Sequence, residues 1–257
     1  MDLETRGGNK KGNFVGFVLL EQPVWDKEDF LRQLKLHWQL QREDSPAKQE
    51  DDNTLVFQCQ GAMVSVALMP APIPGGEAER QAAKNYRWPG GVEQTKRHKA
   101  HLVVGLLNLG LAPAQAGRLM VKILASCCRQ NGVLGVYANG AVYQPQFYLD
   151  CSQMLNNGGF PLFNLVWFGL YQSEKGLCGY TSGLENLGYD EIEVLDSAAG
   201  PEQLVGFLAD LSHYVAAQDV TLRAGETVGF TAEQKFPISR GPGAAVEGDS
   251  LKIVFPG

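Results

Sequence analysis

Several apolar runs in this sequence have the length of a single strand and are flanked by turn residues. The first is FVGFVLL at residues 14–20, and a later one is HLVVGLL at residues 101–107. A short, continuous apolar run of this kind is typical of a strand that is buried on both faces of its sheet. We therefore predict that both runs form interior strands of a covered sheet.

Helix and hairpin signals alternate with these strands. Asp26 is a predicted N-cap, and Phe30, Leu34 and Trp38 follow it at helical spacing. Gln60-Gly61 and Asn139-Gly140 predict tight turns between strands. Because hairpins stand beside crossover helices, we predict an α+β fold with mixed, mostly antiparallel sheets and helices packed on one face.

The 257 residues suffice for one large domain or two smaller lobes. The strongest turn signal in the interior of the chain is NNGGFP at residues 156–161. We predict a first α+β lobe over residues 13–157 and a second over residues 158–257, packed as one compact unit. The halves share no sequence repeat, and a structural duplication into two similar lobes stays open. Residues 1–12 are polar and glycine-containing, which predicts a disordered leader.

The charge balance limits the partners of the chain. The formal net charge is −6 and the pI is near 5.3, so the chain as a whole repels a phosphate backbone. No stretch reaches the roughly 18 apolar residues that cross a bilayer. We therefore expect no nucleic-acid partner and no membrane span, and a cytoplasmic location. The five cysteines are scattered and predict free thiols.

The connection over residues 74–101 holds the richest set of polar and aromatic side chains that we expect to be ordered. Connections at strand ends are where binding sites are usually built. Glu77 or His98 would be the general base of an enzyme here, and Arg80 or Lys84 its anion clamp. We favour the structural alternative, in which a helix opens at Glu77 and the aromatic rings pack on the core. The candidate binding residues of this segment are Glu77, Arg80, Lys84, Asn85, Tyr86, Trp88, His98 and His101.

His98 and His101 are the only pair of imidazoles with a spacing that suits one metal ion. No motif supplies a third ligand, so we predict no metal and no cofactor. Hydrogen-bonding histidines at a helix–strand junction are the preferred interpretation. The glycine-containing segments at residues 179–187 and 238–246 lack a serine-hydrolase or phosphate-binding context and predict tight turns.

Segments along most of the chain resemble a bacterial family of uncharacterised proteins, domain of unknown function 4261. The resemblance runs in order from Val15 to Phe255, and no activity, cofactor or catalytic residue comes with it. A pattern within it, TSGLENLGYDEIEVL, is distantly similar to segments of small bacterial proteins from toxin-immunity neighbourhoods. The segments that carry the resemblance are VGFVLLEQPVWD, VALMPAPIPGGEAE, NYRWP, HKAHLVV, LGVYANGAVYQPQFY, FGLYQSEKGLCGYTSGLENLGYDEIEVLDS, DVTLRAGETVGFTAEQKFPISRG and SLKI.

These observations favour a non-enzymatic protein-binding factor of an immunity-like or accessory kind. Its expected partner is a protein related to a toxin or to secretion, held by an acidic surface that bears aromatic side chains. The alternative is an enzyme or small-molecule binder that uses residues 77–101. The oligomeric state is left open.

Overall fold

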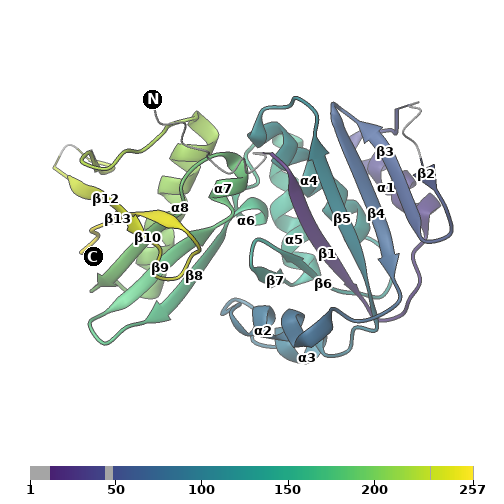
Figure 1. Ribbon diagram of the computed structural model, residues 1–257, viewed down its shortest axis with the longest axis horizontal. Helices are drawn as coiled ribbons and strands as arrows, with labels where there is room; N and C mark the ends of the chain where they lie inside the picture. The colour runs from purple at the N-terminus through teal and green to yellow at the C-terminus, as the bar shows by residue number, and fades with distance from the viewer. Residues whose placement is uncertain (1–11, 44–48, 232, 257) are drawn as a thin grey trace, which may run out of the picture.

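The computed structural model describes residues 12–43, 49–231 and 233–256, and it contains two sheets that lie side by side (Figure 1). Both sheets are mostly antiparallel and carry helices, which confirms the predicted α+β class. The predicted leader, residues 1–12, falls outside the described residues except for Gly12. Within the described residues, no helix is long and apolar enough to cross a membrane.

The first sheet has seven strands in the described part of the chain. β1 pairs with β5 on one side and with β6 on the other, so it is an interior strand as predicted. The Gln60-Gly61 and Asn139-Gly140 turns join strands as expected, and all four turn residues have positive φ. In sheet order the strands are β2 (Gln49–Glu50), β3 (Thr54–Cys59), β4 (Ala62–Met69), β5 (Ala100–Asn108), β1 (Phe14–Leu20), β6 (Val133–Ala138) and β7 (Ala141–Tyr143).

One face of this sheet packs on α1 (Lys27–Trp38), α4 (Pro113–Cys128) and α5 (Pro145–Ser152). The Asp26 side chain caps α1 by accepting a hydrogen bond from Asp29 N at 2.9 Å, as predicted. Gly16 lets β1 approach α4, because a Cβ there would lie 3.0 Å from Leu124 Cδ1. Hence Phe14, Gly16 and Val18 face α4, and their neighbours in β1 face the other way.

The opposite face is only partly covered. The chain between β4 and β5 forms a short 3₁₀ turn (Pro74–Gly76), α2 (Glu77–Ala83) and α3 (Gly91–Thr95). α2 and α3 contact β7 and β6, and they bury a second, smaller apolar cluster around Leu19, Leu134 and Val142. Among the described residues, no helix lies over the strands β3, β4 and β5 on this side (Figure 1).

The second sheet has six strands in the described residues. α8 covers one of its faces, and Gly179 lets the helix approach, since a Cβ there would lie 2.8 Å from Leu208 Cδ1. In sheet order the strands are β11 (Thr227–Val228), β12 (Phe236–Pro242), β13 (Asp249–Ile253), β10 (Ile192–Ser197), β9 (Leu177–Ser182) and β8 (Trp167–Gln172). The helical segments of this half are a 3₁₀ turn (Gln153–Asn157), α6 (Leu162–Leu165), α7 (Leu184–Leu187) and α8 (Pro201–Gln218).

Three expectations for strands and turns are corrected. Val15 in the first strand is 61% exposed and Leu107 in the fifth is 44% exposed, so neither strand is buried on both faces. Residues 238–242, expected in a turn, belong to β12, because they pair with β13 across the hairpin. Residues 179–187, also expected in a turn, instead complete β9 and form α7 after Gly183.

A single apolar cluster runs through both halves of the molecule. At its centre, Gly117 of α4 lies where a Cβ would touch Phe14, Leu165 and Leu187, which come from the two halves. A side chain at Gly117 would push these residues apart, so close packing between the halves depends on this glycine.

Candidate functional site

The predicted acid–base groups of residues 77–101 do not converge. Glu77 accepts a hydrogen bond from the Tyr137 hydroxyl at 2.6 Å, and Arg80 donates to the carbonyl of Gly75. Burial, followed by the bond to Glu77, raises the pKa of Tyr137 above its ordinary value. The Glu77 carboxylate and the Arg80 guanidinium thus each bind a neighbouring group of the fold. Their placement gives no support to the enzymatic alternative.

His98 and His101 are also used within the fold. Nε2 of His98 accepts a hydrogen bond from Ile73 N at 2.9 Å, and its Nδ1 donates to the carbonyl of Thr95. Nδ1 of His101 donates to the carbonyl of Ala71 at 2.8 Å, and burial lowers the pKa of this imidazole. The two rings hold the Ala71–Ile73 connector against β5. Across the described ranges, no group of three or more His, Cys, Asp or Glu side chains is placed to hold a metal ion.

Asn85 is a buried structural residue. Its Nδ2 donates to the carbonyl of Val142 at 2.8 Å, and its Oδ1 accepts from Arg87 N at 3.0 Å. These bonds tie the end of α2 to the edge strand β7.

Replacing Asn85 by alanine should lower the free energy of unfolding by about 2 kcal/mol, because the buried carbonyl of Val142 loses its partner. Denaturant unfolding monitored by circular dichroism measures the change. The neighbouring exposed Lys84→Ala is the control and should stay within about 0.5 kcal/mol of the wild type. A neutral Asn85→Ala would contradict the structural assignment.

Tyr86 joins the segment to the second sheet. Its hydroxyl donates to the carbonyl of Phe168 in β8 at 3.0 Å, and its ring lies 5.4 Å from that of Trp167. The guanidinium of Arg87 lies 5.7 Å from the centre of the Tyr86 ring. Trp88 is half-buried on the small cluster under α2 and α3. Trp88 thus packs on the core as the favoured interpretation predicted, whereas Tyr86 is 43% exposed and does not; Lys84 is exposed.

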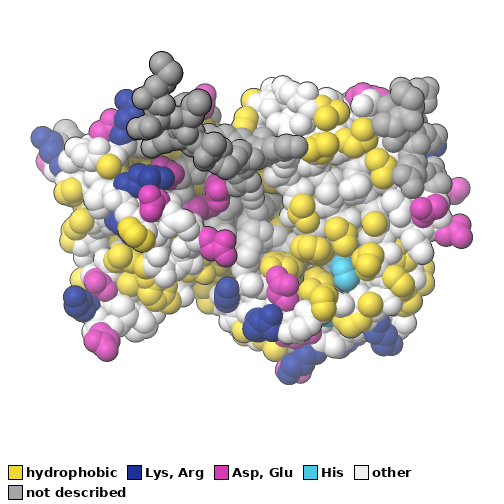
Figure 2. All heavy atoms as spheres, viewed as in Figure 1, with side chains coloured by type: hydrophobic (Ala, Val, Ile, Leu, Met, Phe, Trp, Pro, Cys, Tyr) yellow, Lys and Arg dark blue, Asp and Glu magenta, His cyan; other side chains and the backbone are white. Residues whose placement is uncertain are grey.

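The uncovered half of the first sheet is a continuous uncharged surface. The strands β1, β3, β4 and β5 contain no Asp, Glu, Lys or Arg. Figure 2 shows hydrophobic side chains over this lobe, with charged side chains at its margins. We call this surface the open face, and the strand pairing assigns to it Val15, Phe17, Thr54, Val56, Gln58, Met63, Ser65, Ala67, Met69, His101, Val103, Gly105 and Leu107.

The open face is low at its centre and high at its margins. Gly105 and Ser65 are cross-strand partners, and a Cβ on Gly105 would lie 2.8 Å from Ser65 Oγ. Val15, Met69 and Leu107 stand at the margins and are 61%, 45% and 44% exposed. The centre of the open face thus carries small side chains between larger apolar ones.

A cleft lies between the two sheets and takes in two of the predicted residues. It is an open cleft of about 650 Å³, with Lys84 and Tyr86 on one wall and strands β8 and β9 on the other. We call it the interlobe cleft; its lining residues are Ala83, Lys84, Tyr86, Leu170, Tyr171, Tyr180, Pro201, Ala244 and Ala245. Burial raises the pKa of Tyr180 and, together with a hydrogen bond to Cys178, raises that of Tyr171 to about 12. Both hydroxyls therefore keep their protons at neutral pH.

Tyr180 owes its position to a glycine. Gly169 is its partner on β8, and a Cβ there would lie 2.1 Å from Tyr180 Cζ. The tyrosine ring therefore lies flat across β8.

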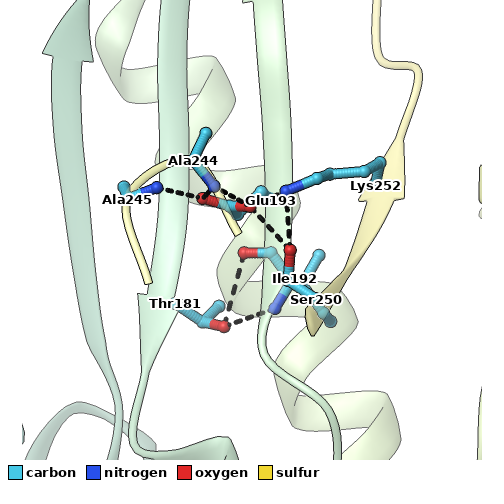
Figure 3. Close-up of polar contacts among 7 residues, drawn as sticks. All are labelled: Thr181, Ile192, Glu193, Ala244, Ala245, Ser250 and Lys252. Carbon is cyan, nitrogen blue, oxygen red and sulfur yellow. Dashed lines mark hydrogen bonds and ion pairs between the residues drawn. The ribbon is translucent and has the colours of Figure 1, made fainter. Parts of the chain in front are cut away.

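A buried carboxylate fixes the loop that closes one side of the interlobe cleft (Figure 3). Glu193 of β10 is fully buried and accepts bonds from Ala245 N at 2.7 Å and from Ser250 Oγ at 2.6 Å. It also accepts from Ala244 N and forms an ion pair with Lys252. Burial opposes ionisation, but these bonds together lower the pKa of Glu193 below its ordinary value.

Sequence reasoning missed the open face, the two cleft tyrosines of the second sheet and Glu193. An acidic residue between the apolar Ile192 and Val194 was a usable signal for Glu193, since a buried charge needs partners. No local signal identified the open face, because its outward positions mix apolar side chains with the polar Thr54, Gln58 and Ser65.

Comparison with known proteins places the second half of the chain in a family context. Residues 180–254 match the model of the family described as Domain of unknown function (DUF4261), which confirms the resemblance over this range. The matched residues include Tyr180 and the whole Glu193 network. No curated protein and no solved structure matches the chain.

Proposed function

We propose that this protein is a non-enzymatic binding factor that holds a partner protein on its open face. The observation that carries the proposal is the uncharged, partly exposed apolar surface of four neighbouring strands. Large exposed apolar patches on soluble domains commonly mark protein–protein contacts. Covering Val15, Met69 and Leu107 would contribute about 1 kcal/mol each.

The charges of the chain complement this surface. With a net charge of −6 carried outside the open face, the protein attracts a basic partner over distance, and the apolar centre then supplies affinity. The expected partner therefore presents an apolar segment flanked by basic residues. An immunity-like or accessory role, with a toxin or a secretion component as partner, fits this mode of binding.

The test places charges on the open face. Met69→Lys combined with Leu107→Lys should leave the free energy of unfolding within about 1 kcal/mol of the wild type, because both side chains are partly exposed. In a pull-down from extracts of the native host, the wild type should retain a partner at stoichiometric level, and the same variant should not. Calorimetry with the purified partner then establishes direct binding.

A matched control carries the same charges elsewhere. Val24 and Leu36 are each 69% exposed and lie before and within α1, so Val24→Lys with Leu36→Lys should keep the partner. Equal retention by all three proteins would refute the proposal. A wild-type dimer that the Met69→Lys, Leu107→Lys variant converts to monomer would assign the open face to a second copy and refute it as well.

A further inference from the structure

β8 is the last strand of the second sheet, and its outer side is not paired with another strand in the described residues. The Tyr86 hydroxyl donates to the Phe168 carbonyl, so this carbonyl points away from β9. In an antiparallel strand, the backbone groups of alternate residues point to the same side. Leu170 and Gln172 therefore present their N–H and carbonyl groups outwards beyond Tyr86.

These outward groups adjoin the interlobe cleft. Leu170 lines the cleft from β8, and Lys84 and Tyr86 line it from the first lobe. Tyr171 and Tyr180 add aromatic surface with hydroxyl donors, and Ala244 and Ala245 close the far side. An extended backbone in this cleft would find hydrogen-bond partners along one edge and apolar contacts on both sides.

The charge in the cleft selects the occupant. Lys84 is exposed and contributes the only charged side chain among the residues that line the cleft. The amides of Ala244 and Ala245 already bind Glu193, so they are not free to hold an anion. An acidic side chain of the occupant would pair with the Lys84 ammonium group.

We propose that an extended peptide segment with an acidic side chain binds in the interlobe cleft by adding a strand to the free edge of β8. Main-chain hydrogen bonds to Leu170 and Gln172 supply the affinity, and Lys84 selects the acidic residue. A small planar acid would satisfy Lys84 and the tyrosines but would leave the strand edge unused. This site is separate from the open face, so the two proposals can fail independently.

The experiment selects short random peptides, displayed on phage, against the wild-type chain. We expect enrichment of peptides with Asp or Glu in a β-prone sequence, and synthetic copies are then measured by fluorescence anisotropy. Lys84→Glu should weaken their binding by about tenfold or more, because an attractive charge pair becomes repulsive. Lys35→Glu, on α1 at the opposite face of the first sheet from α2, is the matched charge control and should leave affinity within about twofold.

The strand edge is tested from both sides. Leu170→Pro removes the outward N–H at a position where an edge strand tolerates proline, and it should abolish binding, whereas Leu170→Ala should retain it. Peptides methylated at alternate backbone nitrogens should also fail to bind. This test uses the wild-type protein, so it still checks strand addition if Leu170→Pro does not fold.

Several outcomes would overturn the proposal. They are the absence of any enriched peptide, binding that survives backbone methylation, and equal binding by a simple aromatic carboxylate, which would indicate a small-molecule site. Loss of peptide binding in the Met69→Lys, Leu107→Lys variant would move the site to the open face and also contradict it.

Discussion

Replacing Lys252 by methionine should lower the free energy of unfolding by about 3 kcal/mol, because the buried Glu193 carboxylate would lose the cation that neutralises it. The Lys252 side chain is only 19% exposed and ion-pairs with the fully buried Glu193. Methionine keeps most of the volume of the side chain, so the loss reports the charge and not a cavity. Urea unfolding measures the change.

An exposed ion pair provides the control. Glu93 lies in α3, and Lys96 follows three positions later, just after the helix. Both side chains are more than half exposed. Lys96→Met should change the free energy of unfolding by less than about 0.5 kcal/mol. A similar small change for Lys252→Met would show that the Glu193 network contributes little to stability.

The Glu193 network also predicts a dependence on pH. Because the pKa of Glu193 is lower in the folded chain than in the unfolded chain, its contribution is present above the ordinary carboxyl pKa. The contribution is lost as the pH falls through the lowered value. Glu193→Gln lacks this carboxylate, so its free energy of unfolding should fall less steeply as the pH is lowered. Urea unfolding over a pH series measures the difference.

Replacing Gly183 by alanine should cost about 3 kcal/mol or more of unfolding free energy, which combines backbone strain with a steric clash. Gly183 has φ of +123°, and a Cβ there would lie 2.2 Å from the carbonyl oxygen of Leu165. Its N–H also donates to Glu191 at 2.7 Å. The turn cannot move away without losing this bond, so thermal and urea unfolding should both shift strongly.

Gly206 is the matched control for this substitution. It lies within α8 with no atom within 4 Å of a Cβ added there. Gly206→Ala should stabilise the protein by about 0.5–1 kcal/mol, because alanine loses less backbone entropy in a helix. If Gly183→Ala behaved like Gly206→Ala, the close contact between β9 and the end of α6 would be wrong.

The same residue explains how the two halves are aligned. Gly183 follows β9, and a Cβ there would lie 3.2 Å from Cγ of Asn139 in the β6–β7 turn. Asn139 in turn donates to the carbonyl of Asn164 at 3.1 Å. The relative placement of the cleft walls thus depends on small residues and polar bonds near the centre of the molecule. Variants at these positions should alter peptide binding in the interlobe cleft through geometry.

The sequence by itself determined the local elements of this protein. The strand at Phe14–Leu20, the α1 cap at Asp26 and the Gln60-Gly61 turn follow from side-chain pattern, capping chemistry and positive φ, all of which act between near neighbours. It also indicated that Trp88 packs on the core, because burying a large aromatic ring is favourable.

Only the tertiary structure decided which apolar face stays uncovered and which polar residues meet. Val15 and Val18 look alike in the sequence, yet one is exposed and the other buried, because α4 covers a single side of β1. Tyr86 meets Phe168 across 82 positions, and Glu193 meets Ala245 across 52. Contacts over such separations depend on how the sheets pack, which local pattern does not encode.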